Sequence, residues 1–360
     1  MFVLQHAILR RLSNVSTFNI VRNIHSHLVL RKEYTTNQND MTNTNHSIPF
    51  YYSTSSDREE NEKLLEPMRY SVQAPGKRIT TTDLIRAFNY WLRISDDKVQ
   101  TINDISRMVH HANDIIDDIE DNSILRRGIP VAHSIYGIAN TINAANYVTF
   151  IALERVLSLQ HPEAAKVYLE QALEFHRGQG MEIFWSTHCI CPTEADYKTM
   201  IIRKGEVFYL ALKLMQLFST CKEDLSLITD TFRLLFQISD DYCDLWLDED
   251  TKNTSYCEDL TEGKFSLPII HALTNNPDDK EIISILKQRT KDNEIKRYCV
   301  QLLEKYGSFK YTRNMLEELD SIARAEIERL GGNPHFVSIL DQLKKWDVKN
   351  VPKNSVAGTS

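Results

Sequence analysis

The acidic stretch at residues 114–127 places the strongest constraint on how this chain can fold. Its aspartates are spaced three and four residues apart, so on an α-helix they would line one face. They are Asp114, Asp117, Asp118 and Asp121. Like charges at this spacing destabilise an isolated helix by about 0.2–0.5 kcal/mol per pair. We therefore expect a positive group on this face, and carboxylate oxygens suit Mg²⁺; a solvated helix surface is the alternative for such a stretch by itself.

A second acidic motif with the same Asp-Asp-x-x-Asp pattern lies at residues 240–244, inside another helical pattern of apolar residues. Two facing acidic helices can hold a group of divalent metal ions, and the ions can bind a diphosphate. Basic residues nearby would then neutralise the leaving group as its C–O bond breaks. We therefore predict that six aspartates are both metal ligands and catalytic residues: Asp117, Asp118, Asp121, Asp240, Asp241 and Asp244.

The composition favours one large helical domain. The 360 residues include only 11 glycines and 10 prolines, and long stretches follow the 3.6-residue helical period without strand alternation. The net charge of −7 argues against a nucleic-acid partner, and no apolar run approaches the roughly 20 residues of a membrane span. The six cysteines are scattered and do not read as a disulfide framework. We predict an all-α, single-domain protein.

The two ends of the chain differ from this central part. Residues 1–32 contain no acidic residue but several arginines among apolar residues and serines, which is typical of an organelle-import sequence. We expect a mitochondrial transit peptide at residues 1–34, with a disordered extension of a cytoplasmic protein as the alternative. A polar linker is predicted at residues 35–62, the helical domain at 63–348 and a disordered tail at 349–360.

The two acidic motifs and their surroundings resemble the trans-isoprenyl diphosphate synthase family, and within it the animal geranylgeranyl diphosphate synthases. The resemblance covers residues 64–335 and is dense in DDIEDNSILRRGIPVAHSIYG from position 117, FQISDDYCDL from 236 and CEDLTEGKFSLPIIHA from 257. It implies an antiparallel helical bundle around a deep central pocket, three Mg²⁺ ions, and a homodimer or higher homo-oligomer. The chemistry that it implies is ionisation of an allylic prenyl diphosphate to a carbocation.

The resemblance also implies which residues bind the diphosphate groups of two substrates. Those that match the site of the allylic diphosphate are Arg126, Gln237 and Lys264. Those that match the site of isopentenyl diphosphate are Lys77, His110 and Arg127. Arg203 and Lys204 stand where the family has Lys-Thr, and we expect both to bind diphosphate as well.

The chain departs from the family pattern mainly in the half of the site that binds isopentenyl diphosphate. The family's Gly-Lys-x-x-Arg pattern ends here in Thr80, so one arginine is missing. Asp114 replaces an apolar residue one turn before the first motif, Thr254 replaces a lysine, and Glu206 stands at a glycine position. The half that ionises the allylic diphosphate is intact, whereas the half that binds the second substrate has lost a charge.

These departures favour a terpene synthase that evolved from a prenyl diphosphate synthase. Such an enzyme ionises a prenyl diphosphate and quenches the carbocation intramolecularly, without isopentenyl diphosphate. We expect geranylgeranyl diphosphate as its substrate, with farnesyl and geranyl diphosphate as alternatives. A working geranylgeranyl diphosphate synthase is the second hypothesis, and a non-catalytic partner subunit of a prenyltransferase is the third.

Overall fold

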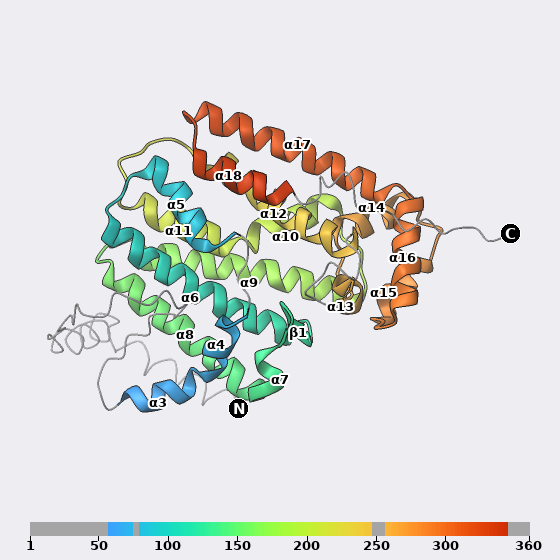
Figure 1. The fold of residues 1–360 in the computed structure, drawn as a ribbon, viewed down its shortest axis with the longest axis horizontal. Helices are drawn as coiled ribbons and strands as arrows, with labels where there is room; N and C mark the ends of the chain where they lie inside the picture. Colours follow the sequence, from blue (N-terminus) through green and yellow to red (C-terminus); the bar gives the residue numbers. More distant parts are fainter. Residues whose placement is uncertain (1–56, 75–78, 247–255, 345–360) are drawn as a thin grey trace, which may run out of the picture. The chain divides into compact units, whose positions relative to one another are not determined.

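The computed structural model describes residues 57–74, 79–246 and 256–344. These residues form sixteen helices and one short two-stranded ribbon (Figure 1). The prediction of an all-α helical bundle is therefore confirmed, and the ribbon is the one strand pairing in the described part of the chain. No helix in these ranges is long and apolar enough to cross a membrane.

Helix α6 (Asp96–Glu120) carries the first acidic motif, and its sequence separates an apolar face from an acidic one. Ile102, Ile105 and Ile115 are fully buried, and they recur with the spacing that keeps one helical face toward the core. The acidic face, spaced by three and four residues, is free to line a site. α6 packs against the next long helix, α8 (Ile138–Ser158), after the short α7 (Ala132–Tyr136).

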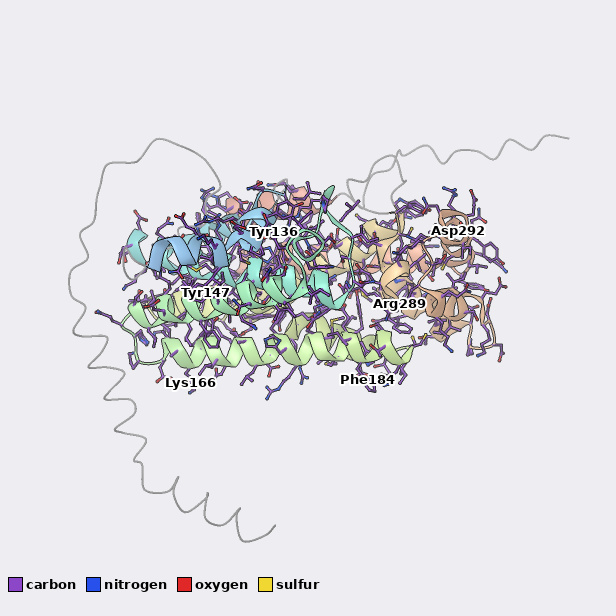
Figure 2. All side chains as sticks on the ribbon, turned by 90° about the horizontal axis from the view of Figure 1, so that it is seen from below. Tyr136, Tyr147, Lys166, Phe184, Arg289 and Asp292 are labelled. Atoms are coloured by element: carbon purple, nitrogen blue, oxygen red, sulfur yellow. The ribbon has the colours of Figure 1, made fainter. Side chains whose placement is uncertain are left out.

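Three long helices run back and forth along the bundle: α6, α8 and α9 (Ala164–His188) (Figure 1). α9 lies along one margin of the body, with Lys166 near one end and Phe184 near the other (Figure 2). It packs against α10 (Glu194–Arg203) and α11 (Glu206–Gln216). α10 begins at the predicted position, because the Thr193 hydroxyl accepts the backbone N–H of Asp196 at 3.1 Å and so caps the helix.

Helix α12 (Ser226–Trp246) carries the second acidic motif and packs on α17 (Ser308–Arg329). Short helices cover the remaining surfaces. They are α3 (Asp57–Leu64), α4 (Glu66–Val72), α5 (Thr81–Leu92), α13 (Glu258–Glu262), α14 (Leu267–Asn275), α15 (Glu281–Gln288), α16 (Asn293–Lys305) and α18 (Pro334–Leu343). Because α3 begins at Asp57, the last residues of the predicted 35–62 linker are helical. The predicted transit peptide and the predicted C-terminal tail lie outside the described residues.

The ribbon follows α6 directly, and the sequence did not predict it. Strand β1 (Leu125–Arg126) pairs antiparallel with β2 (Ile129–Pro130). The two residues between the strands, Arg127 and Gly128, have φ values of 53° and 85°. Positive φ at both positions is the geometry of a two-residue hairpin turn that matches strand twist. The hairpin therefore holds two consecutive arginines in fixed positions beside the end of α6.

Candidate active site

The three aspartates of the first motif differ in exposure: two are partly exposed and one is buried. Asp117 and Asp121 lie one turn apart on α6, and their side chains are 26% and 12% exposed. The Asp118 side chain is only 3% exposed and accepts a hydrogen bond of 2.6 Å from Nε of Arg126. The geometry thus makes Asp117 and Asp121 the residues of this motif best placed to reach a metal ion, while Asp118 anchors the hairpin arginine.

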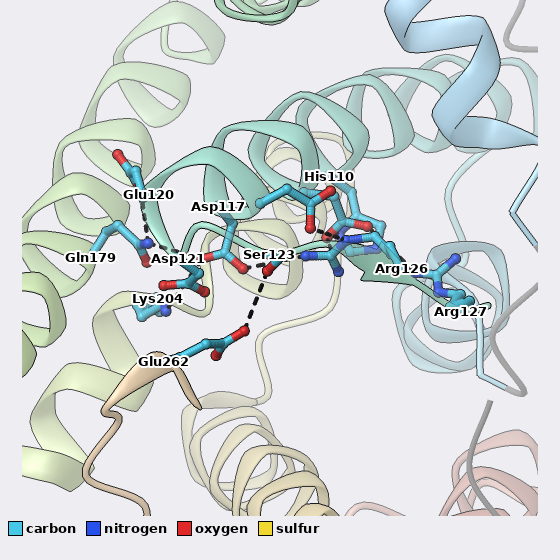
Figure 3. A network of polar contacts seen from close by, with 12 residues as sticks. His110, Asp117, Glu120, Asp121, Ser123, Arg126, Arg127, Gln179, Lys204 and Glu262 are labelled. Carbon is cyan, nitrogen blue, oxygen red and sulfur yellow. Dashed lines mark hydrogen bonds and ion pairs between the residues drawn. The ribbon is translucent and has the colours of Figure 1, made fainter. Parts of the chain in front are cut away.

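Arg126 links the hairpin to the acidic face of α6. Besides Asp118, its guanidinium lies 3.5 Å from Oδ2 of Asp117 and 3.9 Å from Oδ1 of Asp114 (Figure 3). Burial works against a charged guanidinium, but these carboxylates outweigh it, so the pKa of Arg126 lies above its ordinary value. Arg126 is therefore a fixed cation beside the first motif, and its binding of diphosphate stays a prediction.

Helices α9 and α10 add a second set of contacts to Asp117. Nε2 of Gln179 donates to Asp117 at 2.9 Å and to Glu120 at 2.8 Å (Figure 3). Nζ of Lys204 lies 3.9 Å from Asp117 and forms an ion pair with Glu182. Although burial acts in the opposite direction, Lys204 and other nearby cations hold the pKa of Asp117 below its ordinary value. Asp117 is therefore ionised at neutral pH.

This arrangement depends on a glycine in the middle of α9. A Cβ atom on Gly178 would lie 2.9 Å from Cβ of Arg203 and from the backbone nitrogen of Lys204. These distances are shorter than ordinary van der Waals contacts. Gly178 thus allows the close packing that brings the end of α10 near the first motif. A Cβ on Gly180 would have no neighbour within 4 Å.

The segment around α13 closes the site from another side. Nζ of Lys264 lies 2.6 Å from Asp121 and 2.7 Å from Glu262. Glu262 in turn accepts a hydrogen bond of 3.3 Å from the hydroxyl of Ser123, just after α6 (Figure 3). Lys264 thereby joins the α13 segment to the first motif, and its role at the diphosphate stays a prediction.

The second motif shows the same division between buried and accessible aspartates. Asp241 is buried, and its two carboxylate oxygens accept hydrogen bonds from the hydroxyl of Tyr197 and from Nε2 of Gln237. Asp240 is exposed. Asp244 accepts the backbone N–H groups of Glu258 and of the next residue at 3.2 Å and 3.1 Å. Asp240 and Asp244 are therefore the more accessible aspartates of this motif, and Gln237 positions Asp241.

Electrostatically, the site contains more buried carboxylate charge than its own cations offset. Burial raises the pKa of Asp118 to about 6, of Asp121 to about 8 and of Asp241 to about 6, and neighbouring carboxylates act in the same direction. Near the second motif, burial together with Glu262 and Asp244 raises the pKa of Glu258 to about 7. Desolvated carboxylates that repel one another are the environment in which divalent cations bind.

The residues present fit Mg²⁺ in donor type as well. In the described part of the chain, no three acidic, histidine or cysteine side chains converge into a complete ligand cage. Mg²⁺ does not need one, because it usually takes one or two carboxylates and fills its shell with water and substrate phosphate oxygens. Arg126, Lys204 and Lys264 form ion pairs with carboxylates of the site, and all three could contact phosphate oxygens of a substrate.

The other residues singled out in the sequence contact carboxylates outside the two motifs or lie outside the described ranges. The Arg203 guanidinium lies 3.3 Å from Glu174 on α9, so the contacts that the structure gives it do not reach the motifs. His110 and Arg127 both lie against Asp114, at 3.8 Å and 3.4 Å. Lys77 and Thr254 fall outside the described residues.

Thr80, where the family has an arginine, has a structural role here. It is the N-cap of α5: its hydroxyl accepts the backbone N–H of Asp83 at 3.2 Å, and the Asp83 carboxylate accepts the backbone N–H of Thr80 at 2.9 Å. This reciprocal pair is a capping box. The position that the resemblance assigns to substrate binding is therefore used to start a helix.

Sequence reasoning did not assign a role to several residues that complete the site. They are Gln179, Glu182, Tyr197 and Glu262. The mid-helix glycines beside Gln179 and Glu182 were the one available signal, because glycine inside a helix costs about 1 kcal/mol and implies a packing reason. Tyr197 gives no such signal, since a buried tyrosine is common in any helical core.

Comparison with known proteins agrees with this geometry. The Polyprenyl synthetase family model matches residues 33–303. A protein of Matsumurasca onukii named terpene synthase is 56% identical over 296 residues, which are 82% of this chain and 97% of that protein. A geranylgeranyl pyrophosphate synthase of Mucor circinelloides f. lusitanicus is 40% identical over 294 residues (81% and 97%), and one of Hypoxylon pulicicidum is 44% identical over 299 residues (81% and 78%). The chain belongs to the polyprenyl synthetase family of trans-isoprenyl diphosphate synthases, as an enzyme of the prenyltransferase and terpene synthase kind.

Proposed function

We propose that this protein is a Mg²⁺-dependent class I terpene synthase. It ionises an all-trans prenyl diphosphate, with geranylgeranyl diphosphate as the expected substrate, and quenches the carbocation within the same molecule. One observation carries the proposal: the two acidic motifs are complete and cations contact the first of them, whereas His110 and Arg127 are paired with Asp114. The similarity to the Matsumurasca onukii protein named terpene synthase supports it.

In this reaction the residues of the site would have three roles: binding Mg²⁺, binding the diphosphate and positioning Asp241. Asp117, Asp121, Asp240 and Asp244 are the carboxylates placed to hold Mg²⁺, with three ions expected from the family resemblance. When bound, Mg²⁺ supplies positive charge that stabilises the departing diphosphate. Arg126, Lys204 and Lys264 already lie against the first motif and would contact the same diphosphate. Tyr197 and Gln237 hold Asp241 in position through hydrogen bonds to both of its oxygens.

A geranylgeranyl diphosphate synthase is the second candidate, because several relatives of similar length carry that name. It would condense isopentenyl diphosphate with an allylic diphosphate. A non-catalytic partner subunit is a lesser candidate, and the complete motifs argue against it, because a subunit without catalysis has no reason to retain all six aspartates of the two motifs.

The experiment incubates the full chain and Mg²⁺ with geranyl, farnesyl or geranylgeranyl diphosphate, each with and without isopentenyl diphosphate. Hydrocarbons and prenols are then identified by gas chromatography–mass spectrometry. A hydrocarbon formed without isopentenyl diphosphate supports the terpene synthase. Longer prenols that appear only when isopentenyl diphosphate is supplied would establish the second candidate and refute the first, and no turnover of any substrate would favour the partner subunit.

We also propose a homodimer and import into mitochondria. Apolar side chains on α8 and α9 are unusually exposed, and a second copy would cover them. They include Phe150 at 68%, Leu157 at 54%, Leu169 at 53% and Leu173 at 56% exposure. Light scattering tests the dimer, and a monomer at micromolar concentration would refute it. Imaging of a fusion that carries residues 1–34 tests the import, and a cytoplasmic signal would refute it.

A further inference from the structure

Asp114 lies among one imidazole and two guanidinium groups, one turn before the first motif. Its Oδ1 atom is 3.8 Å from Nδ1 of His110 and 3.9 Å from Nη1 of Arg126, and its Oδ2 atom is 3.4 Å from Nη2 of Arg127. The Asp114 side chain is 17% exposed, and those of His110 and Arg127 are 26% and 22% exposed. The Asp114 carboxylate thus contacts three partly buried nitrogen-containing side chains.

The three nitrogen groups come from two elements, helix α6 and the β1–β2 hairpin. His110 precedes Asp114 by one turn on α6, so both side chains lie on the same helical face. The two arginines are held by the β1–β2 hairpin, whose turn at Arg127 and Gly128 has positive φ at both positions. The cationic cluster is therefore set by the backbone of α6 and of the hairpin.

The chemistry of this cluster is that of a phosphate site. Guanidinium groups present paired N–H donors that match phosphate oxygens, and an imidazole can add a further donor. Arg126 also binds Asp118 and Asp117 at 2.6 Å and 3.5 Å, whereas the ion pair that the structure gives for Arg127 goes to Asp114. A second anion would therefore bind mainly to the N–H donors of Arg127, because Arg126 is already bonded to the first motif.

We infer that Asp114 is a built-in counter-ion that occupies this cationic cluster and excludes a second diphosphate, which makes it a residue that determines specificity. This inference rests on the proposed function, in which the enzyme uses one prenyl diphosphate and no isopentenyl diphosphate. Asp114 would explain why the second diphosphate does not bind. A carboxylate excludes phosphate in two ways. It occupies the nitrogen donors sterically, and its negative charge repels an incoming anion at close range. The absence of an arginine at Thr80 would then be only one cause of weak isopentenyl diphosphate binding. The other cause would be Asp114, whose carboxylate neutralises the arginines that remain.

The test is a binding measurement in which no chemistry takes place. Isothermal titration calorimetry measures isopentenyl diphosphate binding to the full chain in EDTA, so that metal-dependent binding at the acidic motifs is absent. Asp114→Asn removes the charge and keeps the shape of the side chain. We expect its affinity to rise on the order of 10- to 100-fold over the wild type, which corresponds to one charge-assisted hydrogen bond regained.

Two control variants separate a local effect from a change in net charge. Asp97→Asn removes one negative charge from the first turn of the same helix, 17 positions earlier (114 − 97), or roughly 25 Å along its axis. It should leave the affinity unchanged. Adding Arg127→Gln to Asp114→Asn should cancel the gain, because the donors released by the first substitution are removed by the second.

Two outcomes of the binding measurement would overturn the role inferred for Asp114. Equal affinities for Asp114→Asn and Asp97→Asn, with the circular dichroism spectrum of the wild type retained, would overturn it. Tight binding of isopentenyl diphosphate by the wild type would overturn it too. If Asp114→Asn does not fold, Asp114→Leu, which restores an apolar residue at this position, takes its place. The proposed function is tested separately, because hydrocarbon formation by the wild type without isopentenyl diphosphate does not depend on any of these affinities.

Discussion

The contact between α9 and α10 leads to a prediction that uses two glycines of the same helix. Gly178→Ala would place a methyl group 2.9 Å from the backbone nitrogen of Lys204, and Gly180→Ala would place one where no atom lies within 4 Å. Both substitutions favour the helical conformation by about 1 kcal/mol, since alanine has the higher helix propensity. That gain cancels in a comparison of the two variants, so their difference measures the packing contact alone.

The magnitude follows from the geometry. Carbon and nitrogen atoms normally approach to about 3.5–4.0 Å, so α10 must retreat by roughly 0.6–1.1 Å from the added methyl group. Overpacking of this kind costs about 1–3 kcal/mol. In a domain of this size 1 kcal/mol corresponds to about 2 °C in Tm, so Gly178→Ala should melt about 2–6 °C below Gly180→Ala. It should also release diphosphate more slowly, because Lys204 moves away from Asp117.

The assay is a thermal melt of both variants by circular dichroism at one scan rate, followed by diphosphate release from geranylgeranyl diphosphate with Mg²⁺. Gly180→Ala serves as the matched control for helix propensity. If Gly178→Ala melts at or above the temperature of Gly180→Ala, the close contact of α10 with α9 is not what holds Lys204 at the site, and the reasoning is refuted.

Three further predictions concern single side chains. Asp117→Ala should abolish diphosphate release with every prenyl substrate, and near-normal turnover would contradict a metal site at the first motif. Thr80→Arg should improve isopentenyl diphosphate affinity but cost about 0.5–2 kcal/mol of stability as the α5 cap is lost, which Thr80→Ser should avoid; an unchanged affinity would mean that the other departures dominate. Tyr197→Phe removes a donor to the Asp241 carboxylate, whose pKa burial raises to about 6, so that pKa should rise further. The acidic limb of the rate profile should then move to higher pH and the Mg²⁺ requirement should rise by about 10-fold or more, whereas an unchanged profile would deny Tyr197 a positioning role.

Local patterns in the sequence predicted the helices that carry chemistry, because helical periodicity is a short-range property. The acidic helix and the helix that carries the second motif agree with the structure. The β1–β2 hairpin could not be predicted in this way. Two-residue strands contain no alternation, and the positive φ of Arg127 is imposed by the turn rather than preferred by arginine.

The roles of adjacent charged residues were the hardest to predict. Arg203 and Lys204 are neighbours in the sequence, yet the contacts of Lys204 reach Asp117, whereas Arg203 pairs with Glu174. Successive residues on a helix point about 100° apart, so tertiary packing decides which one faces a site. Asp118 illustrates the same limit, because it lies beside a ligand in the sequence but at the buried edge of the helix.

The cap at the start of α5 has a consequence for how this chain can change. The hydroxyl and backbone N–H of Thr80 form a reciprocal pair with Asp83. An arginine at this position would add a cation only by giving up the part of the folding stability that the cap supplies. A chain that acquires an arginine here would therefore need a compensating substitution elsewhere in the domain to keep its stability.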